Sequence, residues 1–63
     1  MSRLKRFDEA LHAYDQAVAL KPNYAWAHNG RGIVLEQLSR ARADASLADE
    51  ALDAYEQAVA HAP

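Results

Sequence analysis

The chain has 63 residues, of which seven are basic and nine acidic, giving a formal net charge of -2. A charge so close to neutral provides no basic surface for nucleic acid or for an anionic membrane. The absence of cysteine excludes disulfides, thiolate metal ligands and a cysteine nucleophile. No apolar run approaches the ~20 residues that span a bilayer, and no signal peptide is visible, so we expect no membrane association and a cytoplasmic location.

The first predicted helix, over about residues 3–20, contains one copy of a segment that occurs twice. Residues 7–22 read FDEALHAYDQAVALKP and residues 48–63 read ADEALDAYEQAVAHAP, with 11 of 16 positions identical at an offset of 41. In each copy alanine, leucine, tyrosine and valine recur at the spacing of an amphipathic helix. We therefore expect both copies to be helical, with Leu52 of the second copy in the core. Pro22 ends the first helix.

The second predicted helix covers about residues 24–43. The connection KPNY before it is too short for a crossover, so this helix packs antiparallel to the first. Gly30 and Gly32 interrupt it, and close approach of a neighbouring helix is the usual reason for such glycines. We expect Gly32 to face Ala10 or Ala51.

One face of the second helix has the character of a binding surface. A large aromatic residue is followed by amide, aliphatic and carboxylate side chains at helical spacing, a combination that suits an interface hot spot. The face consists of Trp26, Asn29, Ile33, Glu36 and Gln37. The alternative is that Trp26 only covers the open edge of the first helix.

The third predicted helix covers about residues 47–61, and two arrangements connect it to the second. In the first, the two helices form a hairpin in which Ser46 caps the third helix and Asp49 completes a variant capping box. In the second, residues from about Tyr24 to Ala60 form one continuous helix, because an apolar heptad pattern runs through them. Such a chain would exchange helices with a second copy.

No catalytic or metal-binding group is apparent. His12, His28 and His61 are far apart in the sequence and fall on different predicted helices, without the spacing of a zinc site. The serines and carboxylates lie at helix starts or in solvent-facing positions without a paired base. We therefore expect no enzyme activity, no cofactor, no metal and no small-molecule substrate.

The order Ala-Leu-x-x-Tyr-x-x-Ala-Val before a proline, followed by a helix with a central glycine and then the same order again, resembles the tetratricopeptide repeat. The resemblance covers residues 7–38 and 48–63. It implies an all-α fold of antiparallel helical hairpins in one domain, residues 1–63, with about one and a half repeats. The two prolines are 41 residues apart instead of 34, which indicates a seven-residue insertion.

The resemblance also implies a function. First helices of this family line a concave groove that binds peptides or partner proteins, and the face that begins at Trp26 corresponds to it. His28 occupies the place of a family tryptophan, which directs Trp26 towards the groove. We expect a non-catalytic protein-interaction scaffold. The alternative is a homodimerisation module or a structural part of a longer array, because one and a half repeats leave apolar edges uncovered.

Overall fold

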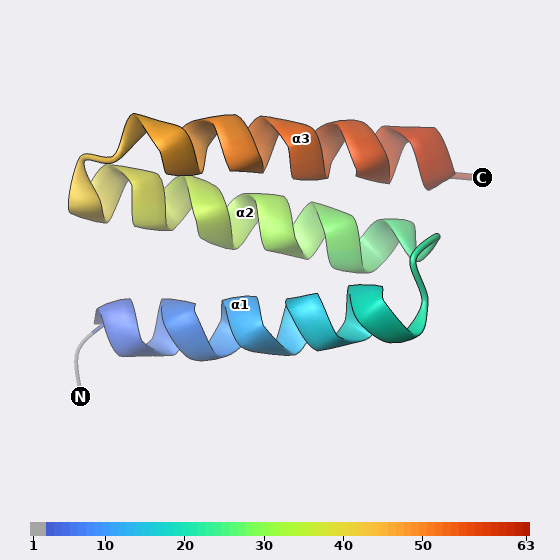
Figure 1. Ribbon diagram of the computed structural model, residues 1–63, viewed down its shortest axis with the longest axis horizontal. Helices are drawn as coiled ribbons and strands as arrows, with labels where there is room; N and C mark the ends of the chain where they lie inside the picture. Colours follow the sequence, from blue (N-terminus) through green and yellow to red (C-terminus); the bar gives the residue numbers. More distant parts are fainter. Residues whose placement is uncertain (1–2) are drawn as a thin grey trace.

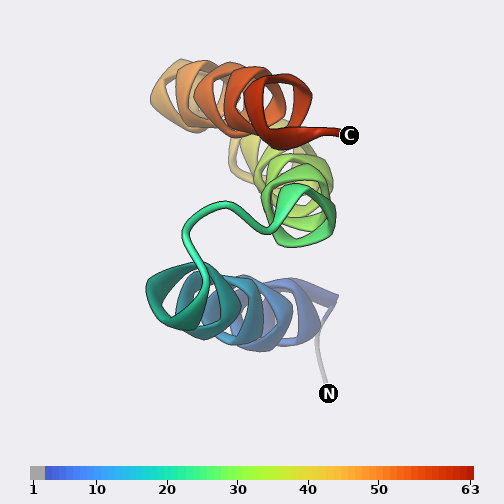
Figure 2. The same ribbon diagram turned by 90° about the vertical axis from the view of Figure 1, so that its right-hand side faces the viewer.

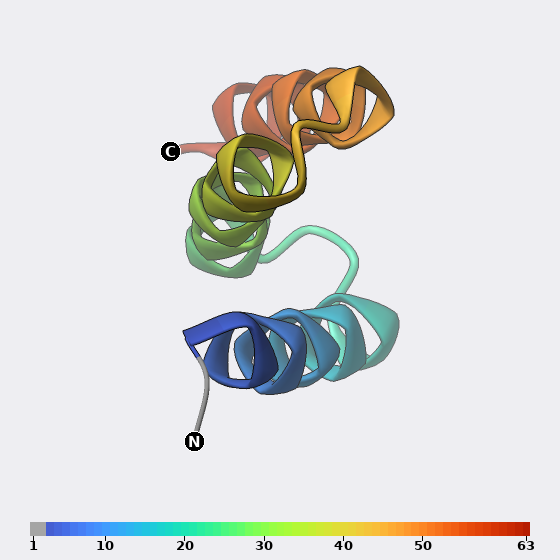
Figure 3. The same ribbon diagram turned by 90° about the vertical axis from the view of Figure 1, so that its left-hand side faces the viewer.

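The computed structural model describes the backbone of residues 3–63 and the side chains of residues 6–63. These residues form α1 (Arg3–Leu20), α2 (Ala25–Arg42) and α3 (Ala45–His61). Consecutive helices run antiparallel, and α2 lies between the other two (Figure 1). Views from the two ends show α1 and α3 on opposite sides of α2, in an open stack (Figures 2 and 3). The expected all-α fold of antiparallel helical hairpins is confirmed.

The turn between α1 and α2 is held by backbone hydrogen bonds and by His28. The N–H of Lys21 donates to the carbonyl of Ala17 at 2.9 Å, and that of Tyr24 donates to the carbonyl of Lys21 at 3.1 Å. His28 is buried, and its Nε2 lies 2.7 Å from the carbonyl oxygen of Pro22. Because this buried imidazole is hydrogen bonded to a carbonyl group of the turn, it fixes where the chain enters α2.

The turn between α2 and α3 makes a hairpin, so the continuous helix does not form. Ala43 adopts the left-handed conformation with φ 50°, which reverses the chain after α2. The backbone N–H of Asp44 donates to the carbonyl of Ser39 at 3.0 Å, and the Ser39 hydroxyl donates to the carbonyl of Asp44 at 2.9 Å. These reciprocal bonds offset the steric cost of a left-handed alanine.

Asp44 caps α3, and the expected cap at Ser46 is wrong. The helix begins at Ala45, and the Asp44 carboxylate accepts hydrogen bonds from the Ser46 N–H at 3.0 Å and the Ser46 hydroxyl at 2.6 Å. The side-chain hydrogen bond from Ser46, followed by the backbone one, holds the pKa of Asp44 below its ordinary value. Both residues are good cap formers, and the left-handed turn at Ala43 decides that the first of them is used.

We expect Asp44→Ala to lower the melting temperature at neutral pH, and Asp44→Asn to lower it less, because an amide oxygen also caps a helix. Since the folded-state pKa of Asp44 is depressed, its contribution is fully present above the unfolded pKa of ~4 and is lost as the pH falls through the folded pKa. Thermal melts at neutral and acid pH check this. A difference between wild type and Asp44→Ala that persists in full at strongly acid pH would contradict the assignment of the cap.

The core lies mainly between α2 and α3. Its fully buried members are Ala27, Leu35, Leu38 and Ala54, and Ala51 is nearly so. Leu11, Leu47 and Tyr55 pack against the cluster that contains Leu35. Leu52 is 59% exposed, so the expectation that it belongs to the core is wrong.

Each central glycine of α2 faces a tyrosine of a different helix. A Cβ atom at Gly30 would overlap the Tyr14 ring of α1, and one at Gly32 would lie 2.9 Å from the Tyr55 ring of α3. The expectation that Gly32 faces Ala10 or Ala51 is therefore wrong, because aromatic rings fill these positions. Close approach of neighbouring helices nevertheless explains both glycines.

Within residues 3–63, no helix combines the length and the apolar character needed to cross a membrane.

Candidate protein-binding site

An apolar pocket of about 360 Å³ opens between the start of α2 and the end of α3. Because the two helices are antiparallel, these segments lie at the same end of the stack (Figure 1). Small side chains on both helices leave room between the larger ones. The lining residues are Ala25, Trp26 and Asn29 from α2 and Tyr55, Ala58, Val59 and Ala62 from α3.

Trp26 is the largest side chain at this pocket, and it is 61% exposed. Its ring meets the Tyr14 ring of α1 edge-on, with centroids 5.5 Å apart, and lies 5.8 Å from the ring of Tyr24. The indole is therefore held on one side by aromatic contacts and presented to solvent on the other. His28 takes the buried position on this helix, two residues further along.

The five residues expected to form a binding face lie along one helix, and the structure divides them between two environments. Trp26 and Asn29 line the pocket. Ile33 and Gln37 are exposed beyond it, on later turns of α2. Glu36 is partly buried, and its carboxylate accepts hydrogen bonds from Arg40 and from the Tyr55 hydroxyl, both at 2.9 Å.

Tyr55 lines the pocket and also bonds to Glu36, the partner of Arg40. Burial, followed by its hydrogen bond to the Glu36 carboxylate, raises the pKa of the Tyr55 phenol above its ordinary value. The phenol therefore stays protonated and donates its hydrogen bond at all ordinary pH values. The wall of the pocket is fixed in place by this bond and by the contact of the ring with Gly32.

The α3 wall of the pocket was not anticipated. Tyr55, Ala58 and Val59 belong to the apolar stripe of the repeated segment, and such a stripe is normally assigned to the core. The missing signal was geometric: among the described helices α3 packs against α2 alone, so part of its apolar stripe is uncovered in this structure.

Several polar side chains of the described residues make contacts within the fold. Among these residues, no group of three histidine, cysteine, aspartate or glutamate side chains is placed to hold a metal ion. The rings of His28 and His61 stack with centroids 5.7 Å apart. The hydroxyls of Ser39 and Ser46 both bond to Asp44 at the hairpin turn.

Comparison with known proteins identifies one family. A protein-family model described as "TPR repeat" matches residues 3–39, more than half of the 63 residues. The match covers α1 and nearly all of α2. A search of curated proteins and a search of solved structures gave no significant match.

Proposed function

Because this chain belongs to the tetratricopeptide-repeat family, we propose that it is a non-catalytic scaffold that binds a peptide or a partner protein between α2 and α3. TPR repeats are generally protein–protein interaction modules and are typically non-catalytic. The observation that carries the proposal is the largely exposed Trp26 beside an apolar pocket. The cytoplasmic location and the absence of a small-molecule substrate stay predictions from the sequence.

The chemistry of the pocket favours a partner with an apolar anchor. Tryptophan is enriched among residues that dominate binding energies, particularly beside a pocket that the partner desolvates. An aliphatic or aromatic side chain entering the pocket would cover Trp26 and Val59 together. Asn29 at the pocket, with Gln37 further along the helix, offers amide groups for hydrogen bonds that orient a peptide backbone.

A random peptide library displayed on phage tests this proposal with the intact chain. Selected peptides should bind Trp26→Ala at least ~10-fold more weakly than wild type, a loss of ~1.4 kcal/mol that is typical of a moderate hot spot. Trp26 is the only tryptophan, so its fluorescence should shift from a solvent-exposed to a buried maximum on binding. Gln16→Ala, on the exposed surface of α1, is the matched control and should bind as wild type.

Asn29→Arg is the second test variant, because Asn29 is exposed and lines the pocket without packing into the core. It should reduce binding by obstructing the pocket while circular dichroism stays unchanged. Peptides that bind both pocket variants as well as wild type would contradict the site, and a library that yields no binding peptide would contradict the function.

Homodimerisation, or a structural role within a longer array, is the second candidate function. It is favoured by Leu52 and Val59, which are 59% and 77% exposed and lie two helical turns apart on one side of α3, because contiguous exposed apolar surface often marks an interaction site. Light scattering and melting over a ~100-fold dilution test homodimerisation. A melting temperature that rises with concentration indicates a dimer, and a constant one with a monomer mass contradicts it.

A further inference from the structure

Two histidines meet where the start of α2 lies beside the end of α3. The rings of His28 and His61 stack with their centroids 5.7 Å apart and their planes inclined by 24°. His28 is buried, whereas His61, the last residue of α3, is exposed. We call these two residues the histidine pair. Since histidine is the side chain that ordinarily changes charge between about pH 8 and 5, this contact between two helices contains groups of variable charge.

The hydrogen bond of His28 determines which of its ring nitrogens carries the proton. A carbonyl oxygen can only accept, so Nε2 carries the proton and donates it to the carbonyl oxygen of Pro22, 2.7 Å away. A second proton would be added at Nδ1, which makes no hydrogen bond within the described part of the chain. The fold therefore gives the charged form of this ring no further protein partner, whereas water would accept from both N–H groups in an unfolded chain.

The position of His28 in α2 also opposes a positive charge. It lies at the start of the helix, where free backbone N–H groups create a partial positive charge. The first turn contains no acidic residue, and Tyr24 at the cap position accepts no hydrogen bond with its side chain. His61 lies at the opposite end of its own helix, where a positive charge is favoured. A charge on His61 is thus placed directly against the buried ring of His28.

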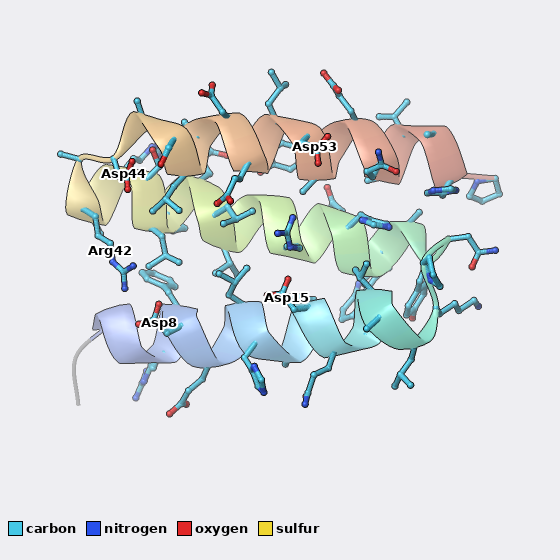
Figure 4. The ribbon with its side chains drawn as sticks, in the orientation of Figure 1. Asp8, Asp15, Arg42, Asp44 and Asp53 are labelled. Carbon is cyan, nitrogen blue, oxygen red and sulfur yellow. The ribbon has the colours of Figure 1, made fainter. Side chains whose placement is uncertain are left out.

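No carboxylate among the described residues pairs with either histidine. Asp15 points from α1 towards α2 (Figure 4), where its Oδ1 lies 2.6 Å from Nε of Arg31. Lys21 in the turn adds a positive charge, with its Nζ 5.0 Å from the centre of the Tyr24 ring. The other titratable groups at this end of the stack are Tyr14 of α1 and Tyr55 and Glu56 of α3. Two protonated histidines would therefore repel each other without a paired counter-charge.

We propose that the histidine pair is a pH-sensitive contact, which holds the end of α3 on the start of α2 at neutral pH and releases it as the pH falls towards about 5.5. The folded arrangement disfavours charge on both rings, so the unfolded chain binds more protons than the folded chain over this range. Stability then decreases as the pH falls. Because the contact joins only the ends of the two helices, the last turns of α3 loosen before the rest of the stack.

The candidate pocket is built on the same two segments. Trp26 and Asn29 lie within two residues of His28, and Ala58 and Ala62 lie within three residues of His61. Loosening of the end of α3 therefore moves one wall of the pocket away from the other. We expect peptide binding to weaken at acid pH, and this part of the inference rests on the function proposed above.

Thermal melting at about pH 8 and pH 5.5 tests the contact in the free chain. The melting temperature of the wild type should fall by at least ~4 °C between these values, in line with the sensitivity of small domains. The cap at Asp44 does not interfere, because its pKa lies below the ordinary value and its carboxylate stays charged over this range.

The chain has three histidines, so each can be removed in turn. His61→Gln should reduce the pH-dependent fall by more than half, and its exposed position makes loss of the fold no concern. His12→Gln is the matched control, because His12 is exposed on α1 and should leave the fall unchanged. His28→Gln is the second test variant, since its side-chain amide can still donate to the carbonyl of Pro22, and it should also reduce the fall.

Hydrogen exchange shows where the stack loosens. After correction for the pH dependence of exchange itself, the amides of Val59 and Ala60 should lose at least ~5-fold protection between about pH 8 and 5.5. The amides of Ala51 and Ala54, in the core, should lose less. In His61→Gln this local loss should be absent.

The proposal is overturned if the wild type melts at the same temperature at both pH values, or if His12→Gln and His61→Gln have equal effects. It is also overturned if protection is lost equally along α3, which would indicate global unfolding. Peptides selected from the library should bind wild type at least ~3-fold more weakly at the lower pH and His61→Gln equally at both. Melting and exchange need no peptide, so failure of the contact and failure of the proposed function can be told apart.

Discussion

Replacing Leu35 with alanine is expected to unfold a large fraction of the chain at room temperature. Leu35 is only 1% exposed and packs with Ala51 and Ala54 at the centre of the interface between α2 and α3. Truncation of a buried leucine to alanine typically costs ~2–5 kcal/mol, and domains of this size have little stability to lose. Urea unfolding followed by circular dichroism measures the loss.

Leu52→Ala is the control for this prediction, because it makes the same substitution in a helix of the same stack. Leu52 is largely exposed, so its truncation should change the free energy of unfolding by less than ~1 kcal/mol. Equal losses for the two variants would contradict the placement of the core.

The second large effect is expected for Gly32→Leu. Even the first side-chain carbon at this position would lie 2.9 Å from the Tyr55 ring, which is closer than van der Waals contact. The ring cannot withdraw without breaking the hydrogen bond from its hydroxyl to Glu36. Overpacking of this kind typically costs ~1–3 kcal/mol, and chemical denaturation should register it.

Gly30→Leu should cost less than Gly32→Leu, although a Cβ atom at Gly30 also overlaps a tyrosine. The atoms it would meet are at the far end of the Tyr14 ring. Tyr14 belongs to α1, which packs less extensively against α2 than α3 does, and its hydroxyl has no hydrogen bond within the described part of the chain, so the ring and helix can shift. A larger loss at Gly30 would mean that the first hairpin is the more rigid one.

The helices themselves were predictable because local signals determine them. The repeated amphipathic segment, Pro22 and the short connection after α1 all act through the neighbouring sequence. The hairpin turn between α2 and α3 was harder to predict, because the sequence has no glycine there to mark it. It depends on the left-handed conformation of Ala43 and on the hydrogen bonds between Ser39 and Asp44.

Burial within the repeated segment was not predictable from periodicity. An apolar stripe of helical spacing indicates which side of a helix avoids water, but not how many neighbours it meets. Leu11 and Leu52 occupy equivalent sequence positions, yet only Leu11 has a helix packed over it. The difference comes from the place of each helix in the stack, which a local pattern does not contain.

Only the α2 side of the candidate site was predictable, because a local pattern does not contain the packing of one helix on another. Spacing along α2 placed Trp26 and Asn29 on one side of a helix, and the structure brings both to a pocket. The opposite wall comes from Ala58 and Val59 of α3, about thirty residues away in sequence. Only the packing of α3 against α2 brings these two segments together.

The most direct test of the proposed scaffold is nuclear magnetic resonance mapping of a peptide selected from the library. Binding between α2 and α3 should shift the indole signal of Trp26 and the backbone amides of Asn29, Ala58 and Val59, with weaker shifts along α2 at Ile33 and Gln37. The signals of the backbone amides on the solvent-facing side of α1 should not shift. Shifts confined to α1, with the Trp26 indole unmoved at saturating peptide, would contradict the account.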